Sequence, residues 1–149
     1  MNEITIFSVA EWFLNKEPMT HKKLQKLCWY AYSWFIYIEN DSPEDLTNKL
    51  FDCKFQAWVH GPVSTELYDI YKGSGMTLLE TSKSPKFNAE VEKFLNDIFD
   101  NYGEFDGGEL ESITHQELPW KNARGDLKPY EASQNVISDK DIFKEYAER

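Results

Sequence analysis

The sequence predicts a mainly α-helical fold, in which a compact bundle of about five to six helices surrounds a buried central helix at residues 20–39. A short strand or β-ribbon is predicted near residues 50–59. The chain has 149 residues, the length of one ordinary domain, so we treat residues 1–149 as a single domain. Hydrophobic residues make up 41% of it, with 10 Phe, 8 Tyr and 5 Trp, which is enough for one packed core. The stretch 20–39 is apolar on nearly all sides, which is typical of an enclosed helix.

The central helix is predicted from apolar residues that recur at steps of three, four and seven, the spacing of one helical face. They are Leu24, Leu27, Cys28, Ala31, Phe35 and Ile38. Trp and Tyr side chains fill much of the remaining circumference, and their polar ends need hydrogen-bond partners. The apolar run covers about a dozen residues, whereas a membrane span needs roughly 20. We therefore predict the central helix of a soluble domain, with Thr20 as its N-cap.

The first helix is predicted at residues 5–16 and ends before Pro18, because the residue that precedes a proline is pushed out of helical geometry. Residues 50–59 alternate between apolar and polar side chains, which is the period of a strand. A lone strand needs a partner, and the best candidate in the sequence is residues 77–80.

A further helix is predicted directly after Gly61, which permits backbone conformations that are closed to other residues. Pro62 suits the first turn of that helix, and Gly73 is a typical C-terminal glycine. Its expected inward residues are Val63, Leu67, Ile70 and Tyr71.

Residues 88–102 form the clearest amphipathic pattern, with Asn88 as the cap and Gly103 as the stop. Asp106 and Glu109 resemble a capping pair for a short helix that carries Leu110 and Ile113.

Residues 114–137 are predicted to be mostly irregular, and a long loop inside a compact domain is usually functional or mobile. Ser138 and Asp141 cap a last helix, whose expected inward residues are Ile142, Phe143, Tyr146 and Ala147.

Charge and cysteine content restrict the class of protein. The net charge is −10, from 26 acidic and 16 basic residues, which disfavours direct nucleic-acid binding and favours attraction to a basic partner. The only two cysteines, Cys28 and Cys53, lie in apolar surroundings and form no C-x-x-C pair, which indicates buried free thiols in a reducing compartment. The sequence shows no secretion signal. We expect a cytoplasmic protein.

The sequence offers little support for catalysis or a cofactor. His21, His60 and His115 are scattered, and neither cysteine lies beside one of them, so no metal site and no cofactor are expected. Cys28 lies on the apolar face of the central helix, where burial raises the pKa of a thiol, so core packing is favoured over nucleophilic catalysis. We expect no enzyme activity.

Several polar and aromatic residues have two possible roles. Gln25 and Lys26 either lie at a surface edge or hydrogen-bond a specific group, such as the loop at His60. Trp58 and His60 flank the end of the predicted strand, as a packed aromatic ring and a loop histidine.

His115 and Trp120 form a second pair of polar and aromatic candidates. His115 is expected in the last turn of a helix, where its charged form is favoured, and Trp120 is expected to close the core from a loop.

Three motifs in order resemble the Panacea domain of SocA-like antitoxins, a family that includes phage-associated proteins. They lie at residues 24–34, 57–68 and 114–120: Leu24-Gln25-Lys26-Leu27 with the aromatic run that follows, Ala57-Trp58-Val59-His60-Gly61-Pro62-Val63, and Thr114-His115 with Pro119-Trp120. The resemblance covers most of the chain, but residues 121–135 have no counterpart in it. Cys28, Trp29 and His60 depart from the residue types that are common in the family.

The resemblance implies a mostly helical antitoxin that neutralises a cognate protein toxin by direct contact, with a possible adaptor role towards a Clp-type protease. The alternative is a phage-encoded inhibitor of a bacterial defence nuclease that uses the same scaffold. An aromatic surplus suits an interaction surface. The candidate partner-binding residues are Gln25, Lys26, Tyr30, Trp58, His60, Gly61, Pro62, His115 and Trp120. Whether a toxin contacts this set or the acidic loops stays open at this point.

Overall fold

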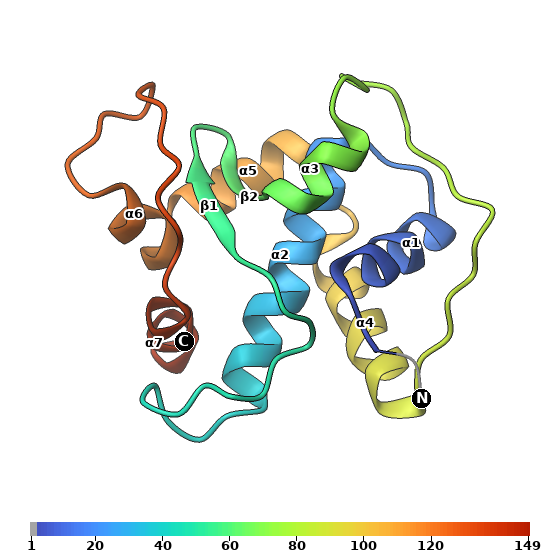
Figure 1. The fold of residues 1–149 in the computed structure, drawn as a ribbon, viewed down its shortest axis with the longest axis horizontal. Coiled ribbons are helices and arrows are strands. Elements are labelled where there is room, and N and C mark those ends of the chain that lie inside the picture. The colour runs from blue at the N-terminus through green and yellow to red at the C-terminus, as the bar shows by residue number, and fades with distance from the viewer. Residues whose placement is uncertain (1–2) are drawn as a thin grey trace.

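The computed structural model describes residues 3–149, which form seven α-helices and one two-stranded antiparallel sheet (Figure 1). Helix α2 (His21–Ile38) runs through the middle of the molecule. Beside it lie α1 (Ile6–Lys16) and α4 (Ala89–Tyr102) on one side, and α6 (Leu118–Arg124) and α7 (Asp139–Ala147) on the other. The prediction of a mainly helical fold is confirmed, with seven helices in the described chain instead of five to six.

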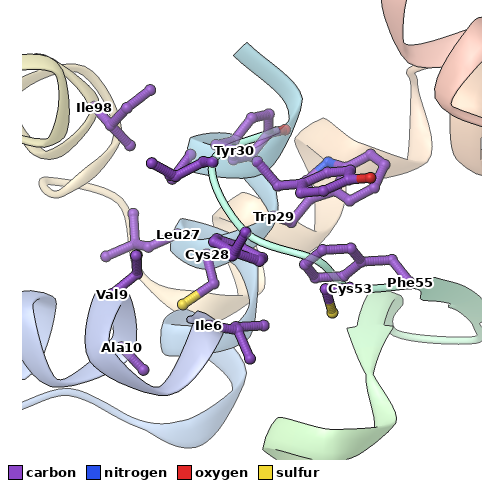
Figure 2. Packing of buried hydrophobic residues seen from close by; sticks show 14 of the residues in the cluster. Ile6, Val9, Ala10, Leu27, Cys28, Trp29, Tyr30, Cys53, Phe55 and Ile98 are labelled. Carbon is purple, nitrogen blue, oxygen red and sulfur yellow. The ribbon is translucent and has the colours of Figure 1, made fainter. Parts of the chain in front are cut away.

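The central helix is enclosed as predicted. Every residue from 24 to 33 is buried, so α2 is covered around its circumference for nearly three turns. Thr20 is its N-cap and accepts a hydrogen bond from the Lys23 backbone N–H at 3.3 Å. Figure 2 shows how α1, α2, α4 and the segment that leads into the sheet meet in one core, with Cys28 and Cys53 as free thiols inside it. Burial raises the pKa of the Cys28 thiol well above its ordinary value.

Three helices begin where the sequence predicts, and α1 and α4 also end there. The N-cap of α1 is Thr5, which forms a capping box with Ser8. Asn88 caps α4, and Gly103 follows its last residue. The short helix α5 (Gly107–His115) starts at the predicted pair, because Asp106 accepts from the Glu109 N–H at 2.8 Å and Glu109 accepts from the Asp106 N–H at 3.0 Å.

The strand is shorter than predicted and has a different partner. β1 (Phe55–Trp58) pairs with β2 (Gly61–Ser64), and residues 59 and 60 form the turn. Residues 77–80 are therefore not the second strand; Leu79 instead forms an isolated bridge with Met19. The opposite edge of β1 receives residues 135–137, since the Ala57 N–H donates to Asn135 at 2.9 Å and the Ile137 N–H donates to Phe55 at 2.8 Å.

Pro62 lies in β2 and not in a helix, which corrects the prediction. Proline has no N–H to donate, so it is tolerated only at a sheet edge, and β2 is such an edge. The helix α3 (Thr65–Tyr71) starts one turn later, where the Ser64 hydroxyl accepts from the Leu67 N–H at 3.2 Å. It ends before Gly73, as predicted, but Ile70 is 61% exposed and does not point inward.

The region predicted to be irregular contains the short helix α6. Pro119 lies in its first turn, where a missing N–H leaves no hydrogen bond unmade, so the proline starts this helix instead of preventing it. Helix α7 begins after Ser138 as predicted and buries Ile142, Phe143 and Tyr146, whereas Ala147 is exposed. Among residues 3–149, no helix combines the length and the apolar character needed to cross a membrane.

Candidate functional site

The outer edge of β2 is completed by a side chain of α2. Gln25 is 2% exposed; its carboxamide donates to the Ser64 carbonyl at 3.1 Å and accepts from the Ser64 N–H at 2.9 Å. One amide thus supplies the donor and the acceptor that a neighbouring strand would supply, and unpaired buried backbone groups are costly. The second donor of the same amide lies 3.1 Å from Nε2 of His21. That nitrogen therefore acts as an acceptor, and burial lowers the pKa of His21.

Lys26 bonds the next carbonyl along the same edge. Its side chain is 1% exposed, and Nζ donates to the Pro62 carbonyl at 3.2 Å. Burial lowers the pKa of Lys26 to about 7, although the nearby Glu111 carboxylate acts in the opposite direction. The surface-edge hypothesis for Gln25 and Lys26 is wrong, because both side chains are buried and hold the hairpin.

Gly61 makes room for Lys26. Its φ of +109° is rarely adopted by residues with a side chain. A Cβ at this position would lie 2.6 Å from Cε of Lys26 and 3.0 Å from Oγ1 of Thr114. The hairpin therefore requires glycine here both for its turn and for its close approach to α2. We call Gln25, Lys26, Gly61, Pro62 and Ser64 the hairpin cluster.

His60 lies at the tip of the hairpin and is mostly exposed. Its Nδ1 is 3.1 Å from the Glu111 carboxylate, which also accepts from Nζ of Lys22 at 2.7 Å. Burial would raise the pKa of Glu111, but the hydrogen bonds from Lys22 and His60 outweigh it and lower that pKa. This ion-pair group fastens the hairpin tip to α5 and to the start of α2.

Helix α6 holds the hairpin from the other side. The Trp120 indole N–H donates to the Trp58 carbonyl at 2.8 Å, and the His115 ring stacks on Trp120 at 3.9 Å. Arg124 lies over the same indole and donates to the Ala57 carbonyl at 3.0 Å. Burial lowers the pKa of His115, so the expectation that the helix end favours its charged form is wrong.

Tyr30 lies apart from the hairpin. Its ring stacks on Tyr102 at 4.0 Å, and its hydroxyl donates to Glu117 at 3.1 Å. Glu117 is 5% exposed and also accepts from Arg149 at 2.5 Å, while the Arg149 guanidinium lies 4.6 Å from the Tyr146 ring. We call Tyr30, Tyr102, Glu117, Tyr146 and Arg149 the Tyr30 cluster.

The structure thus separates Tyr30 from the other eight predicted residues, which surround the hairpin. Ser64, Glu117, Arg124 and Arg149 were not among the residues predicted from the sequence. Glu117 stands inside the Thr114–Trp120 motif, so its position was a usable signal. The two arginines had no such signal, because they lie far along the chain from the groups that they bond.

A surface pocket of about 490 Å³ opens beside the hairpin cluster. Gln25, Lys26, Trp58 and His60 are among the residues that line it. The Trp58 and Tyr68 rings meet edge to face at 4.9 Å and form an aromatic wall. The pocket offers lysines, a histidine ring and aromatic faces to a ligand. Across residues 3–149, no three His, Cys, Asp or Glu side chains are grouped to share a metal ion.

The chain matches the family model described as antitoxin SocA-like, Panacea domain, over residues 24–121. That range is more than half of the chain and contains all nine predicted site residues, both strands and the hairpin cluster. Arg124 and Arg149 lie outside it. Neither a curated protein nor a solved structure matches the chain.

Proposed function

Since the chain belongs to the SocA-like antitoxin family through its Panacea domain, we propose that it neutralises a protein toxin by binding it directly. The observation that carries this proposal is the family match over residues 24–121, which contains the hairpin cluster and the lining of the pocket beside it apart from His21 and Lys22. The resemblance read from the sequence implies the same role.

Two features support action by binding and not by catalysis. The buried polar side chains of the hairpin cluster are bonded to the backbone of β2, which positions the hairpin. Glu117 is likewise bonded to Tyr30 and Arg149. Burial also raises the pKa of Cys28, which leaves it a poor nucleophile at neutral pH.

A titration of purified protein against its toxin tests the proposal. The toxin is sought in the neighbouring reading frame and assayed for growth arrest when expressed alone. Direct neutralisation predicts that activity falls in proportion to added protein and that the two chains co-elute in size-exclusion chromatography. Complete inactivation at a hundredfold molar deficit would indicate an enzyme. A toxin that is unaffected at molar excess would overturn the proposal.

Delivery of the toxin to a Clp-type protease is a finer form of the same proposal. It predicts that the half-life of the toxin in cells shortens when this protein is present and recovers when the protease gene is deleted. Protection from the toxin that persists in the deletion strain, with an unchanged toxin half-life, would leave binding alone as the mechanism.

The net charge of −10 favours a second candidate function, that of a phage-encoded protein that inhibits a bacterial defence nuclease. An acidic surface of this kind would occupy a nucleic-acid channel. Its complex with a nuclease would weaken steeply with added salt, because exposed charges are screened within about 10 Å at 0.1 M salt. A complex insensitive to salt argues against this candidate.

A further inference from the structure

The lining of the pocket beside the hairpin cluster differs in charge from the rest of the chain. Lys22, Lys26 and Lys72 line it, together with two of the three histidines, His21 and His60. Within residues 3–149, no Asp or Glu lines this pocket, although the chain has 26 acidic residues. The pocket is therefore a local basic site on an acidic protein.

The cations of this lining differ in how firmly they are held. Lys26 is buried, and Lys22 is bonded to Glu111 at 2.7 Å. Among the described residues Lys72 is paired only with Asp69, at 3.7 Å, and both side chains are more than half exposed. A pair of that kind contributes little, so Lys72 can turn to an incoming anion at small cost.

An apolar rim continues from the pocket. Met76 and Leu78 are 85% and 60% exposed, and they account for two of the seven exposed large hydrophobic residues among those described. Met76 and Leu78 line an adjoining hollow of about 500 Å³, which shares Lys22 with the basic pocket. Apolar side chains gathered beside a hollow mark an interaction site.

We propose that the basic pocket and the rim of Met76 and Leu78 form the face that binds a protein partner. The pocket takes a carboxylate side chain of the partner, and the apolar residues beside that carboxylate pack on the Trp58–Tyr68 wall and on the rim. The identity of the partner as a toxin rests on the proposed function, whereas the chemistry of the pocket does not.

The acidic character of the chain does not oppose this anchor. Charges that lie further than about 10 Å away are largely screened at 0.1 M salt, so the net charge acts mainly on the approach of the partner. At the pocket itself Lys22 and His60 are already bonded to Glu111 and Lys26 is buried, so contact with the anion is decided mainly by Lys72. An acidic anchor in the pocket is compatible with a partner whose remaining surface is basic.

A matched pair of peptides tests the pocket. The probe is acetyl-Glu-Leu-Glu-Leu-amide, and its neutral control is acetyl-Gln-Leu-Gln-Leu-amide. In an NMR titration of the full chain, the acidic peptide should shift the Trp58 indole N–H and the amides of Gly73 and Gly75 in a saturable way. The neutral peptide should bind about tenfold more weakly, the ratio expected for the loss of one favourable charge contact of about 1.4 kcal/mol. Equal binding of both peptides, saturable shifts only elsewhere, or no shift with either would overturn the inference.

Two lysine variants sharpen the test. Lys72→Gln should weaken binding of the acidic peptide severalfold. Lys93→Gln on α4 is the control, because Lys93 is also exposed and paired with a nearby carboxylate on its own helix, Asp97 at 3.2 Å. It should leave the affinity unchanged. Equal effects of the two variants would indicate general charge attraction and would contradict a specific pocket.

The outcomes separate this inference from the proposed function. A protein that neutralises its toxin but binds neither peptide retains the function and loses the pocket. A protein that prefers the acidic peptide but leaves every tested toxin active retains the pocket and loses the function.

Discussion

Lys26 on α2 and Glu117 next to this helix are both buried ionisable side chains, yet within residues 3–149 only Glu117 has an oppositely charged group in contact with it. Lys26 donates to a backbone carbonyl at 3.2 Å, whereas Glu117 accepts from Arg149 at 2.5 Å and from the Tyr30 hydroxyl at 3.1 Å. The hairpin cluster therefore holds its cation with a neutral dipole, and the Tyr30 cluster holds its anion with an ion pair.

The two arrangements give different sensitivity to pH. Burial lowers the pKa of Lys26 to about 7, so its charge changes near neutral pH. Burial also raises the pKa of Glu117, but the hydrogen bonds from Arg149 and Tyr30 limit the rise. A buried charge without an ionic partner is easily neutralised. A small change of pH or of a side chain therefore has a larger consequence in the hairpin cluster than in the Tyr30 cluster.

The largest expected effect comes from Gly61→Ala. The added Cβ meets Cε of Lys26 at 2.6 Å on a backbone with φ of +109°. We expect a loss of about 3 kcal/mol in the free energy of unfolding, from strain and overpacking together. Urea denaturation followed by tryptophan fluorescence measures it.

Gly73→Ala is the matched control for this prediction. Its φ is +88°, but an added Cβ would meet no atom of the described chain within 4 Å. It should cost about 1 kcal/mol, from backbone strain alone. Equal losses in the two variants would show that Lys26 does not pack against the turn.

The second prediction concerns pH. The pKa of Lys26 is about 7 in the folded protein and 10.5 ordinarily, so between these values the unfolded chain binds more protons than the folded one. The free energy of unfolding contributed by this residue therefore rises with pH. From pH 7 to pH 9 we expect the wild type to gain about 2 kcal/mol relative to Lys26→Met, which does not titrate there.

Urea denaturation of both proteins at several pH values measures this difference. Tyrosines and thiols with raised pKa are common to both chains, so their effects cancel in the comparison. Parallel pH curves for the two proteins would mean that the pKa of Lys26 is not lowered and that its ammonium group is not buried against the Pro62 carbonyl.

The fold was predictable wherever a short-range signal decides the structure. The N-caps at Thr5, Thr20, Asn88, Asp106 and Ser138 and the apolar periodicity of α2 are local signals, and they placed five helices correctly. β2 was missed because four residues that contain a proline have no strand period, and their outer edge is completed by Gln25 from 39 residues away. α6 was missed within the segment predicted to be irregular, because this short helix contains Pro119, a residue that helices tolerate only in the first turn.

The candidate site was predictable in part. Gln25 and Lys26 stood out in the sequence as polar residues among leucines. Of the two hypotheses for them, the one that predicts specific hydrogen bonds is correct. The bonded segment is β2 instead of the loop at His60. The burial of Lys26 was not predictable, because it depends on the space left by Gly61, a contact between residues 35 positions apart.

The third prediction tests the ion pair of the Tyr30 cluster. Arg149→Gln leaves the buried Glu117 carboxylate without its cation. Breaking a fully buried pair costs several kcal/mol, but the Arg149 side chain is 37% exposed and water screens part of the interaction. We expect a loss of between about 1 and 2 kcal/mol at pH 7. Lys144→Gln is the control, because it removes a positive charge from the exposed surface of α7, and it should cost less than about 0.5 kcal/mol. An equal loss of stability in the two variants would show that the Arg149–Glu117 ion pair does not stabilise the fold.

The smallest effect is expected for Tyr30→Phe, which keeps the stack on Tyr102 and removes one hydrogen bond to Glu117. We expect a loss of about 1 kcal/mol in the free energy of unfolding, and almost none for Tyr37→Phe, whose half-buried ring packs on Phe143.

Tyr30→Phe in the Arg149→Gln background tests whether the hydrogen bond and the ion pair depend on each other. Without Arg149, the pKa of Glu117 rises further because burial is no longer opposed by the guanidinium. Glu117 then binds a proton more readily, and a hydrogen bond to a neutral carboxyl is weaker than one to a carboxylate. The cost of Tyr30→Phe should therefore fall in this background, which a double-mutant cycle at pH 7 measures. An unchanged cost would mean that Glu117 stays ionised without its partner, and the contrast drawn with Lys26 would then be wrong.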